Sequence, residues 1–326
     1  MDALSAVLKS VRLEGALYLD AEFTAPWSMR GQYGMASVKR RLAGADHVVY
    51  FHLLTEGTCK VRLADGTEVL DVGAGDLVLF PQDDRHLMGS DLHVAPLDGE
   101  NFNGGHEPAP KLVPMRYGGG GAPTRFVCGY LACNRSLCRP LLDALPRVLH
   151  IPIGDGMAAS LLRELLRVGV QESSASGPGS LSTLTKLAEL MFVEALRRYA
   201  ESLPPDGKGW LAAVRDAQVG RALALLHGDP AKGWTVDELA REVALSRSAL
   251  AERFATLVGE PPMQYLTRWR LALAARTLRS GSEALSRVAE RSGYESEAAF
   301  NRAFKREFGL PPAAWRRTAP QQPGRT

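Results

Sequence analysis

The chain has 326 residues, of which 45% are hydrophobic and 23% charged, with a formal net charge of +3 at pH 7; this is the composition of an ordinary globular protein, with enough length for two domains. No apolar run reaches the 18 or more residues of a membrane-spanning helix, and residues 1–10 lack the basic and apolar parts of a secretory leader. We therefore expect a cytoplasmic protein without membrane association, whose four cysteines are reduced thiols.

Residues 46–81 have the pattern of short β-strands. Residues 47–54 form a largely apolar run that predicts a buried strand, and over 59–63 apolar residues alternate with basic ones, which is the period of a half-buried strand. Glycine-containing turns separate these segments, so a small barrel or sandwich is expected. Residues 101–123 are rich in glycine and proline and predict a long loop.

After residue 149 the apolar period becomes helical. Residues 157–170 and 181–199 are each predicted to form an amphipathic helix. The second helix has one apolar face, which either packs on the β-rich part or pairs two protomers; the sequence does not choose between these. The face consists of Leu184, Leu187, Leu190, Met191 and Ala195.

The C-terminal part contains an internal repeat. One copy covers residues 239–262 and the other residues 288–312, and both end in Gly-x-Pro-Pro. In each copy a short helix precedes a turn, and a serine, Ser246 or Ser296, then caps a second helix. A helical bundle with solvated arginines would explain one such pattern. Two copies in register favour a pair of helix-turn-helix units.

The second helix of each copy would present its outward side chains to the major groove of DNA. Residues 263–279 are predicted to form one helix of about 25 Å between the copies, compatible with successive major-groove faces about 34 Å apart. Residues 206–326 carry 19 Lys and Arg against 13 Asp and Glu, which suits a polyanionic partner. The predicted DNA-binding residues are Arg247, Ser248, Glu252, Glu297, Ala298, Asn301, Arg302 and Lys305.

Residues 215–317 resemble the AraC/XylS family of transcriptional regulators. Residues 289–312 lie very close to that family's C-terminal motif, and residues 265–276 resemble its linking helix. The resemblance implies that one chain places both recognition helices on one face of double-stranded DNA, next to a promoter, and usually activates RNA polymerase. Glu252 departs from the long polar or basic side chain that family members often carry there. An acid accepts a hydrogen bond from cytosine but repels phosphate, so the second recognition helix is the stronger candidate for base contacts.

The β-rich part resembles the cupin-type sensory domain of a large AraC subgroup over most of residues 1–200. The resemblance implies an α+β protein, with an N-terminal cupin-like β-barrel and following helices joined to an all-α double helix-turn-helix domain. The motifs that carry it are residues 25–27, 51–57, 75–81, 127–129 and 140–146, together with His86.

This organisation predicts four segments. The first is a sensory domain that ends in helices able to mediate a homodimer, and the last is a disordered tail. In chain order the segments are residues 1–204 (sensory domain), 205–214 (linker), 215–317 (DNA-binding domain) and 318–326 (tail).

Metal-binding cupins hold a divalent transition metal with histidines and a glutamate from two motifs. His52, Glu56 and His86 fall on matching positions, but Tyr50 stands where the first histidine is usual. His52 and His86 are therefore candidate metal ligands. The missing ligand favours the alternative, in which both are polar residues hydrogen-bonded inside a metal-free barrel.

The cysteines provide a second candidate site. Cys128, Cys133 and Cys138 follow one another at five-residue steps, and Cys128 lies in a Val-Cys-Gly motif that resembles oxidant-responsive members of the subgroup. An exposed thiolate of low pKa at Cys128, with Cys133 as a partner thiol, would form a redox sensor. Cysteines would also complete a zinc site with His52 or His86. The alternative is that they are buried small hydrophobes, with control by an organic effector or by none.

The predicted function is sequence-specific transcription regulation, most often activation, under control of an effector, metal or redox signal. The rival class is a metal-dependent cupin enzyme fused to a DNA-tethering module, which the missing ligand argues against. The Gly118–Gly121 run lacks the strand and helix of a nucleotide-binding motif. We therefore predict a protein that is not an enzyme, with double-stranded DNA, RNA polymerase, a second copy of the chain and a small-molecule effector as partners.

Overall fold

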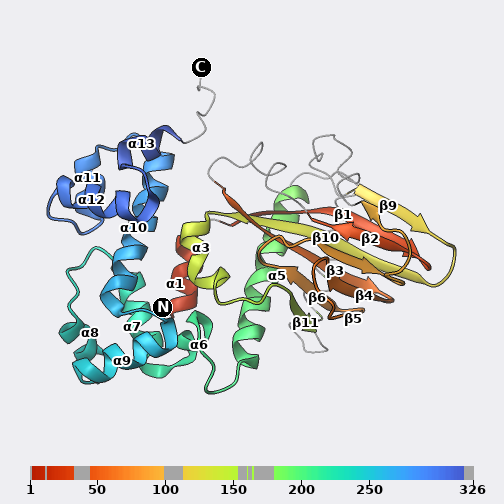
Figure 1. Cartoon of the computed structure of the whole chain (residues 1–326), viewed down its shortest axis with the longest axis horizontal. Coiled ribbons are helices and arrows are strands. Elements are labelled where there is room, and N and C mark those ends of the chain that lie inside the picture. Colours follow the sequence, from red (N-terminus) through yellow and green to blue (C-terminus); the bar gives the residue numbers. More distant parts are fainter. Residues whose placement is uncertain are drawn as a thin grey trace.

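The computed structural model describes residues 2–11, 13–32, 45–98, 113–152, 160, 164 and 180–318. The N-terminal part is built mainly of strands and the C-terminal part of helices (Figure 1), which confirms the predicted fold class. Most of the predicted helix at 157–170 and nearly all of the predicted tail lie outside the described residues. No helix in the described ranges is long and apolar enough to cross a membrane.

The strands form two sheets. The six-stranded sheet has the order β11-β6-β3-β10-β1-β9 and the five-stranded sheet the order β5-β4-β7-β2-β8, so the described strands do not close into one hydrogen-bonded barrel. The larger sheet contains β1 (Glu14–Thr24), β3 (His47–Glu56), β6 (Asp76–Phe80), β9 (Val113–Gly118), β10 (Pro123–Cys133) and β11 (Leu149–Pro152). The smaller contains β2 (Ser28–Gly31), β4 (Thr58–Leu63), β5 (Leu70–Gly73), β7 (His86–Gly89) and β8 (Leu97–Asp98).

One correction to the sequence prediction concerns these sheets. β9 lies inside the range predicted as a long loop and pairs in parallel with β1 at the edge of the large sheet. An edge strand tolerates Pro114, which has no backbone N–H to donate to a ladder. β3, by contrast, confirms the predicted buried strand, since it is buried from His47 to Leu54. Its continuous apolar run reflects a strand covered on both faces.

The two faces of β3 belong to different cores. Val48, Tyr50 and Leu54 lie in the core between the sheets, which we call the inner core. Val49 and Phe51 lie on the other side, in a core covered by helix α5 (Ser180–Ser202). Because side chains alternate along a strand, each step along β3 passes from one core to the other.

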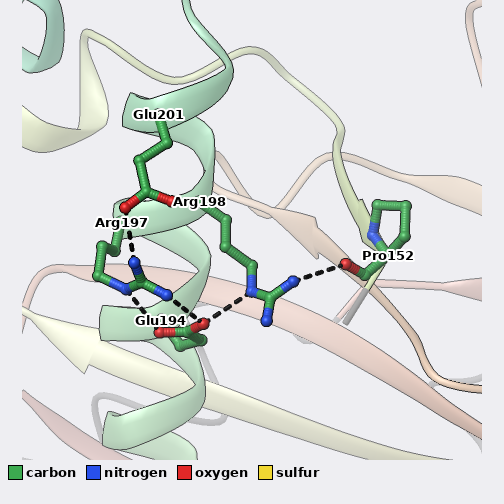
Figure 2. Close-up of polar contacts among 5 residues, drawn as sticks. All are labelled: Pro152, Glu194, Arg197, Arg198 and Glu201. Atoms are coloured by element: carbon green, nitrogen blue, oxygen red, sulfur yellow. Dashed lines mark hydrogen bonds and ion pairs between the residues drawn. The ribbon is translucent and has the colours of Figure 1, made fainter. Parts of the chain in front are cut away.

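Helix α5 uses its apolar face against the sheet. It packs on β1, and the predicted face is buried except at Leu190, which is 48% exposed. Its outer side carries a network of ion pairs in which Glu194 lies between Arg197 and Arg198 (Figure 2). Arg198 also donates to the carbonyl oxygen of Pro152 at 3.2 Å, which joins α5 to β11. The structure thus uses this apolar face within one chain.

The C-terminal helices form the two repeat units. The first unit contains α6 (Trp210–Arg215), α7 (Ala217–Gly228), α8 (Val236–Glu242) and α9 (Arg247–Val258). Helix α10 (Pro262–Ser280) leads to the second unit, with α11 (Leu285–Arg291), α12 (Glu297–Phe308) and α13 (Pro312–Arg317). Helix α6 overlaps the C-terminal half of the range predicted as a linker, residues 205–214, after α5 ends at Ser202.

The repeat is visible in the caps of the second helices. Ser246 and Ser296 accept hydrogen bonds from the backbone N–H groups of Ala249 and Ala299, each at 3.2 Å. Both helices end at a glycine in the left-handed region, with φ of 89° at Gly259 and 75° at Gly309, where a side chain would be strained. The same local signals therefore begin and end α9 and α12.

The N-terminal part of the chain, up to the end of α5, and the first unit share one core. The core under α5 continues through α1 (Ala3–Ser10) and α3 (Arg135–Leu142) into the first unit. Helix α1 packs against α7, α3 and α6, and Val7 is fully buried there. The shared core joins residues far apart in the sequence, and we call it the joint core.

The second unit has a separate core around Phe300 and Phe304, built on the last turns of α10. Three arginines connect this end of the molecule to the N-terminal part. Arg276 donates to the carbonyl oxygen of Ser10, Arg279 pairs with Asp46 at 3.0 Å, and Arg139 on α3 lies 3.8 Å from Glu307. Contacts of the second unit with the N-terminal part are therefore largely polar.

The joint core contains a buried polar network. The Tyr265 hydroxyl accepts from Trp210 Nε1 at 2.8 Å and lies 2.7 Å from His227 Nε2. Burial lowers the pKa of His227 to about 3. The folded state therefore binds fewer protons than the unfolded state below the ordinary histidine pKa of about 6.5.

This difference predicts acid sensitivity. Stability from neutral His227 is fully present above pH 6.5 and is lost as pH falls toward the folded pKa. Between pH 7.5 and 5.5 the wild type should lose about 1.4 kcal/mol more unfolding free energy than His227→Gln. Urea unfolding at both pH values measures this, with His93→Gln, at a fully exposed position, as the control. Equal losses in wild type and His227→Gln would contradict the prediction.

Candidate nucleic-acid interface and the buried histidine pair

The eight predicted DNA-binding residues lie on the outer faces of the two second helices. Arg247, Ser248 and Glu252 lie on α9, and the other five on α12; all are exposed except Asn301, which is half-buried. The opposite faces bury Leu250 and Phe254 on α9 and Phe300 and Phe304 on α12. The apolar period that holds each helix therefore turns these polar side chains toward solvent.

The two helices differ in whether their predicted basic DNA-binding side chains are already ion-paired within the protein. Arg247 is 3.3 Å from Asp237 on α8, so its guanidinium already has an anionic partner. Within the described ranges, Arg302 and Lys305 have no ion pair, and both are exposed. The outer face of α12 thus presents two unneutralised cations, whereas that of α9 presents Glu252 beside a paired arginine.

The two units are joined by contacts of residues that the sequence pattern does not single out. Arg270, on α10, donates to the carbonyl oxygens of Pro230 at 2.5 Å and of Lys232 at 2.7 Å, both in the loop before α8. Gly293, in the turn before α12, lies against the same guanidinium. The partners are 38 and 40 residues away from Arg270, so no local pattern could have found them.

His52 and His86 meet in the inner core, and neither is exposed. Their Nε2 atoms are 2.8 Å apart, His52 Nδ1 is 2.9 Å from the Cys128 Sγ, and His86 Nδ1 is 3.0 Å from the carbonyl oxygen of Asp84. A carbonyl oxygen only accepts, so His86 Nδ1 must be the donor there. This fixes the direction of the other two hydrogen bonds: the Cys128 thiol donates to His52 Nδ1, and His52 Nε2 donates to His86 Nε2.

The hydrogen-bonded series Cys128–His52–His86 consists of neutral groups. Burial lowers the pKa of His86 to about 4, and burial together with the neighbouring His86 lowers that of His52 well below its usual value. The ring of Phe80 stacks on His86 with centroids 3.6 Å apart. Gly31 also lies against the His86 ring. A Cβ added at Gly31 would lie 2.3 Å from His86 Nε2, so only glycine permits β2 to lie this close to the ring.

The surroundings of the pair do not complete the predicted metal site. Glu56 is half exposed and lies 3.3 Å from Arg125, so it does not join the histidines. Among the residues that the structure describes, no group of three or more His, Cys, Asp and Glu side chains is arranged to hold a metal ion. The ring nitrogens of His52 and His86 are instead engaged with each other and with Cys128 and Asp84.

The cysteines are divided between the two cores. Cys128 lies in the inner core and Cys133 in the joint core, because five residues along β10 place them on opposite faces. The structure therefore does not bring Cys128 and Cys133 together; Cys133 lies beside Cys138 instead. The redox hypothesis required an exposed thiolate of low pKa, whereas Cys128 is fully buried and burial raises its pKa.

Comparisons with known proteins cover both parts of the chain. Residues 2–201 match the cupin family, and residues 239–318 match the helix-turn-helix domain family. An AraC-like transcription regulator of Streptomyces lividans is 37% identical over 273 residues, covering 84% of this chain and 88% of that one. The HTH-type transcriptional regulator AlkR of Acinetobacter baylyi is 30% identical, covering 97% and 99%. The RCS-specific HTH-type transcriptional activator RclR of Escherichia coli K12 is 28% identical, covering 97% of each.

Proposed function

Because the chain belongs to the AraC-like transcriptional regulators, with a cupin-like domain before its DNA-binding part, we propose that it activates transcription in response to a signal received by the cupin-like domain. The observation that carries this proposal is the joint core, which connects the sheet to the first helix-turn-helix unit. A change in the sheet would reach the DNA-binding surface through this packing. Activity on chromosomal DNA would take place in the cytoplasm.

We propose that α9 and α12 enter successive major grooves. On α12, Asn301 and Arg302 suit base edges, and Lys305 suits phosphate. Glu297 and Ala298 begin the same exposed face. On α9, Ser248 and Glu252 are the candidates for base contacts, and Arg247 would exchange Asp237 for a phosphate. RNA polymerase and a second copy of the chain are proposed partners by family relationship alone.

The signal itself is proposed to act at the strands that carry the histidine pair. β3 and β10 hold His52 and Cys128 on their inner face and joint-core residues on the other. This arrangement is consistent with an organic effector that binds here and displaces the hydrogen bonds among Cys128, His52 and His86. A metal at His52 and His86, or oxidation of Cys128, would first require these buried groups to rearrange.

Selection of genomic fragments by the purified full chain tests the proposed function. The protein is used reduced, oxidised and metal-stripped, and the enriched fragments are sequenced. Recovery of one short motif supports the regulator, and a change in enrichment among the three preparations identifies its input class. If none of the preparations enriches a motif, the proposed function is wrong.

Arg302→Ala should weaken binding to the selected motif by roughly 1–3 kcal/mol and relax the base preference at one position. The reason is that an unpaired, exposed arginine on α12 suits bidentate contact with guanine. Titration of labelled duplexes measures the effect, and Arg197→Ala on the exposed side of α5 serves as the control. Unchanged affinity and unchanged base preference would remove Arg302 from the interface.

A further inference from the structure

Arg270 lies at a junction of three segments. It belongs to α10, which passes from the first unit to the second. Its guanidinium donates to two carbonyl oxygens of the first unit, at Pro230 and Lys232. The planar fork of arginine suits two acceptors at fixed positions, which the single ammonium group of lysine cannot match.

The second unit contacts the same group. A Cβ added at Gly293 would lie 2.9 Å from the Cζ of Arg270 and 3.1 Å from the carbonyl oxygen of Ala231. Gly293 has φ of +74°, so both its conformation and the lack of space require glycine. The turn that begins the second recognition helix therefore rests on Arg270 and on the loop of the first unit.

The contact continues into the second recognition helix. Tyr294 follows Gly293, and its ring meets that of Phe300 on α12 in an edge-to-face arrangement with centroids 5.5 Å apart. Phe300 is fully buried in the core of the second unit. The orientation of α12 is thus connected, through Tyr294 and Gly293, to the position of the Arg270 guanidinium.

We propose that Arg270 is a positioning residue that fixes the rotation between the two helix-turn-helix units and thereby sets the spacing of half-sites that the protein accepts. The inference rests on the proposed function, since it assumes that both units bind DNA. A rigid pair of units has its binding geometry before it meets DNA, so it pays less ordering entropy at the correct spacing. The same rigidity excludes spacings that differ by one base pair.

The test uses Arg270→Met in the full chain, with duplexes derived from the motif that the wild type selects. One duplex has the native spacing, two have one base pair added or removed, and two have one half-site scrambled. We expect affinity at the native spacing to fall by about tenfold, and the preference over the altered spacings to shrink toward equality. Binding to the duplexes with one intact half-site should change by less than about twofold.

Controls separate this role from general damage. Arg268→Met removes an arginine from the same helix, but one that pairs with Glu260 just before α10, so the spacing profile should stay that of the wild type. Arg270→Lys keeps the charge without the fork and should also lose the spacing preference. Gly293→Ala disturbs the junction from the other side and should broaden or shift the profile. Thermal unfolding of each variant identifies any that fails to fold.

The outcomes distinguish the two proposals. If the wild type shows no dependence on a second half-site, the use of both units is wrong. If the wild type depends on spacing and folded Arg270→Met and Gly293→Ala variants show the same profile, the positioning role of Arg270 is wrong. An equal loss on all duplexes would also overturn it, because that result indicates a general contribution to stability or charge.

Discussion

Phe304→Ala will unfold the second helix-turn-helix unit at a temperature at which the rest of the chain remains folded. Phe304 is fully buried and contacts the rings of Phe308 and Trp315, with centroids 4.6 and 5.9 Å away. Removing a buried phenylalanine side chain costs about 3–5 kcal/mol. The core of the second unit is small and separate from the joint core, so it has little other packing with which to absorb this loss.

The repeat provides a matched control for this experiment. Phe254 occupies the equivalent position in the first unit and is also fully buried, but it belongs to the joint core. Phe254→Ala should therefore destabilise the first unit and the N-terminal part together. Hydrogen exchange followed by mass spectrometry distinguishes the two patterns. Fast exchange over α11 and α12 alone in Phe304→Ala supports the prediction, whereas one common transition in both variants contradicts it.

Val7→Asp should destabilise the N-terminal part and the first unit at once. Val7 has no exposed surface and lies in the joint core, where α1 packs on α7. An unpaired carboxylate there costs several kcal/mol or forces α1 out of its site. Thermal unfolding should show a large decrease in Tm, and hydrogen exchange should increase in β3 as well as in α7.

Lys9→Asp is the control for the aspartate itself, because it places the same side chain at an exposed position of the same helix. It should change Tm by only a degree or two, since exposed substitutions usually cost less than about 0.5 kcal/mol. The prediction would be wrong if Val7→Asp left α7 as protected as in the wild type. In that case α1 would cover the first unit without stabilising it.

The helix-turn-helix repeat could be predicted because its signals are local. Serine caps, apolar residues three and four apart, and terminal glycines act within one or two turns of helix. Ser246 and Gly259 therefore mark the limits of α9 without any knowledge of the tertiary structure. The exposed faces of α9 and α12 follow from the same periods, which is why the predicted interface residues emerge on the surface.

The rest depends on contacts between distant segments. Cys128 is buried because β10 lies between β1 and β3 in the large sheet, an order that no local pattern contains. The edge strand β9 could not be predicted because it lies in the glycine- and proline-rich range 101–123, whose composition indicates a loop. The junction at Arg270 joins a helix to a loop about forty residues earlier, and the docking of α1 on α7 joins the start of the chain to its last third.

The course of the joint core determines where this protein can be recombined with its relatives. A hybrid that exchanges everything after residues 205–214 would replace one side of a continuous apolar contact, including Val219 and Leu223 on α7. Each half would then pack against a surface with different side chains. On α10, by contrast, Trp269 belongs to the joint core and Ala274 to the core of the second unit. Leu271 of the second unit's core and Ala272 of the joint core alternate between them, so a graft within residues 270–273 would move almost the whole second unit and leave the joint core nearly complete. If both units bind DNA as proposed, such a graft would change target specificity at one half-site, while the N-terminal part keeps its packing on the first unit.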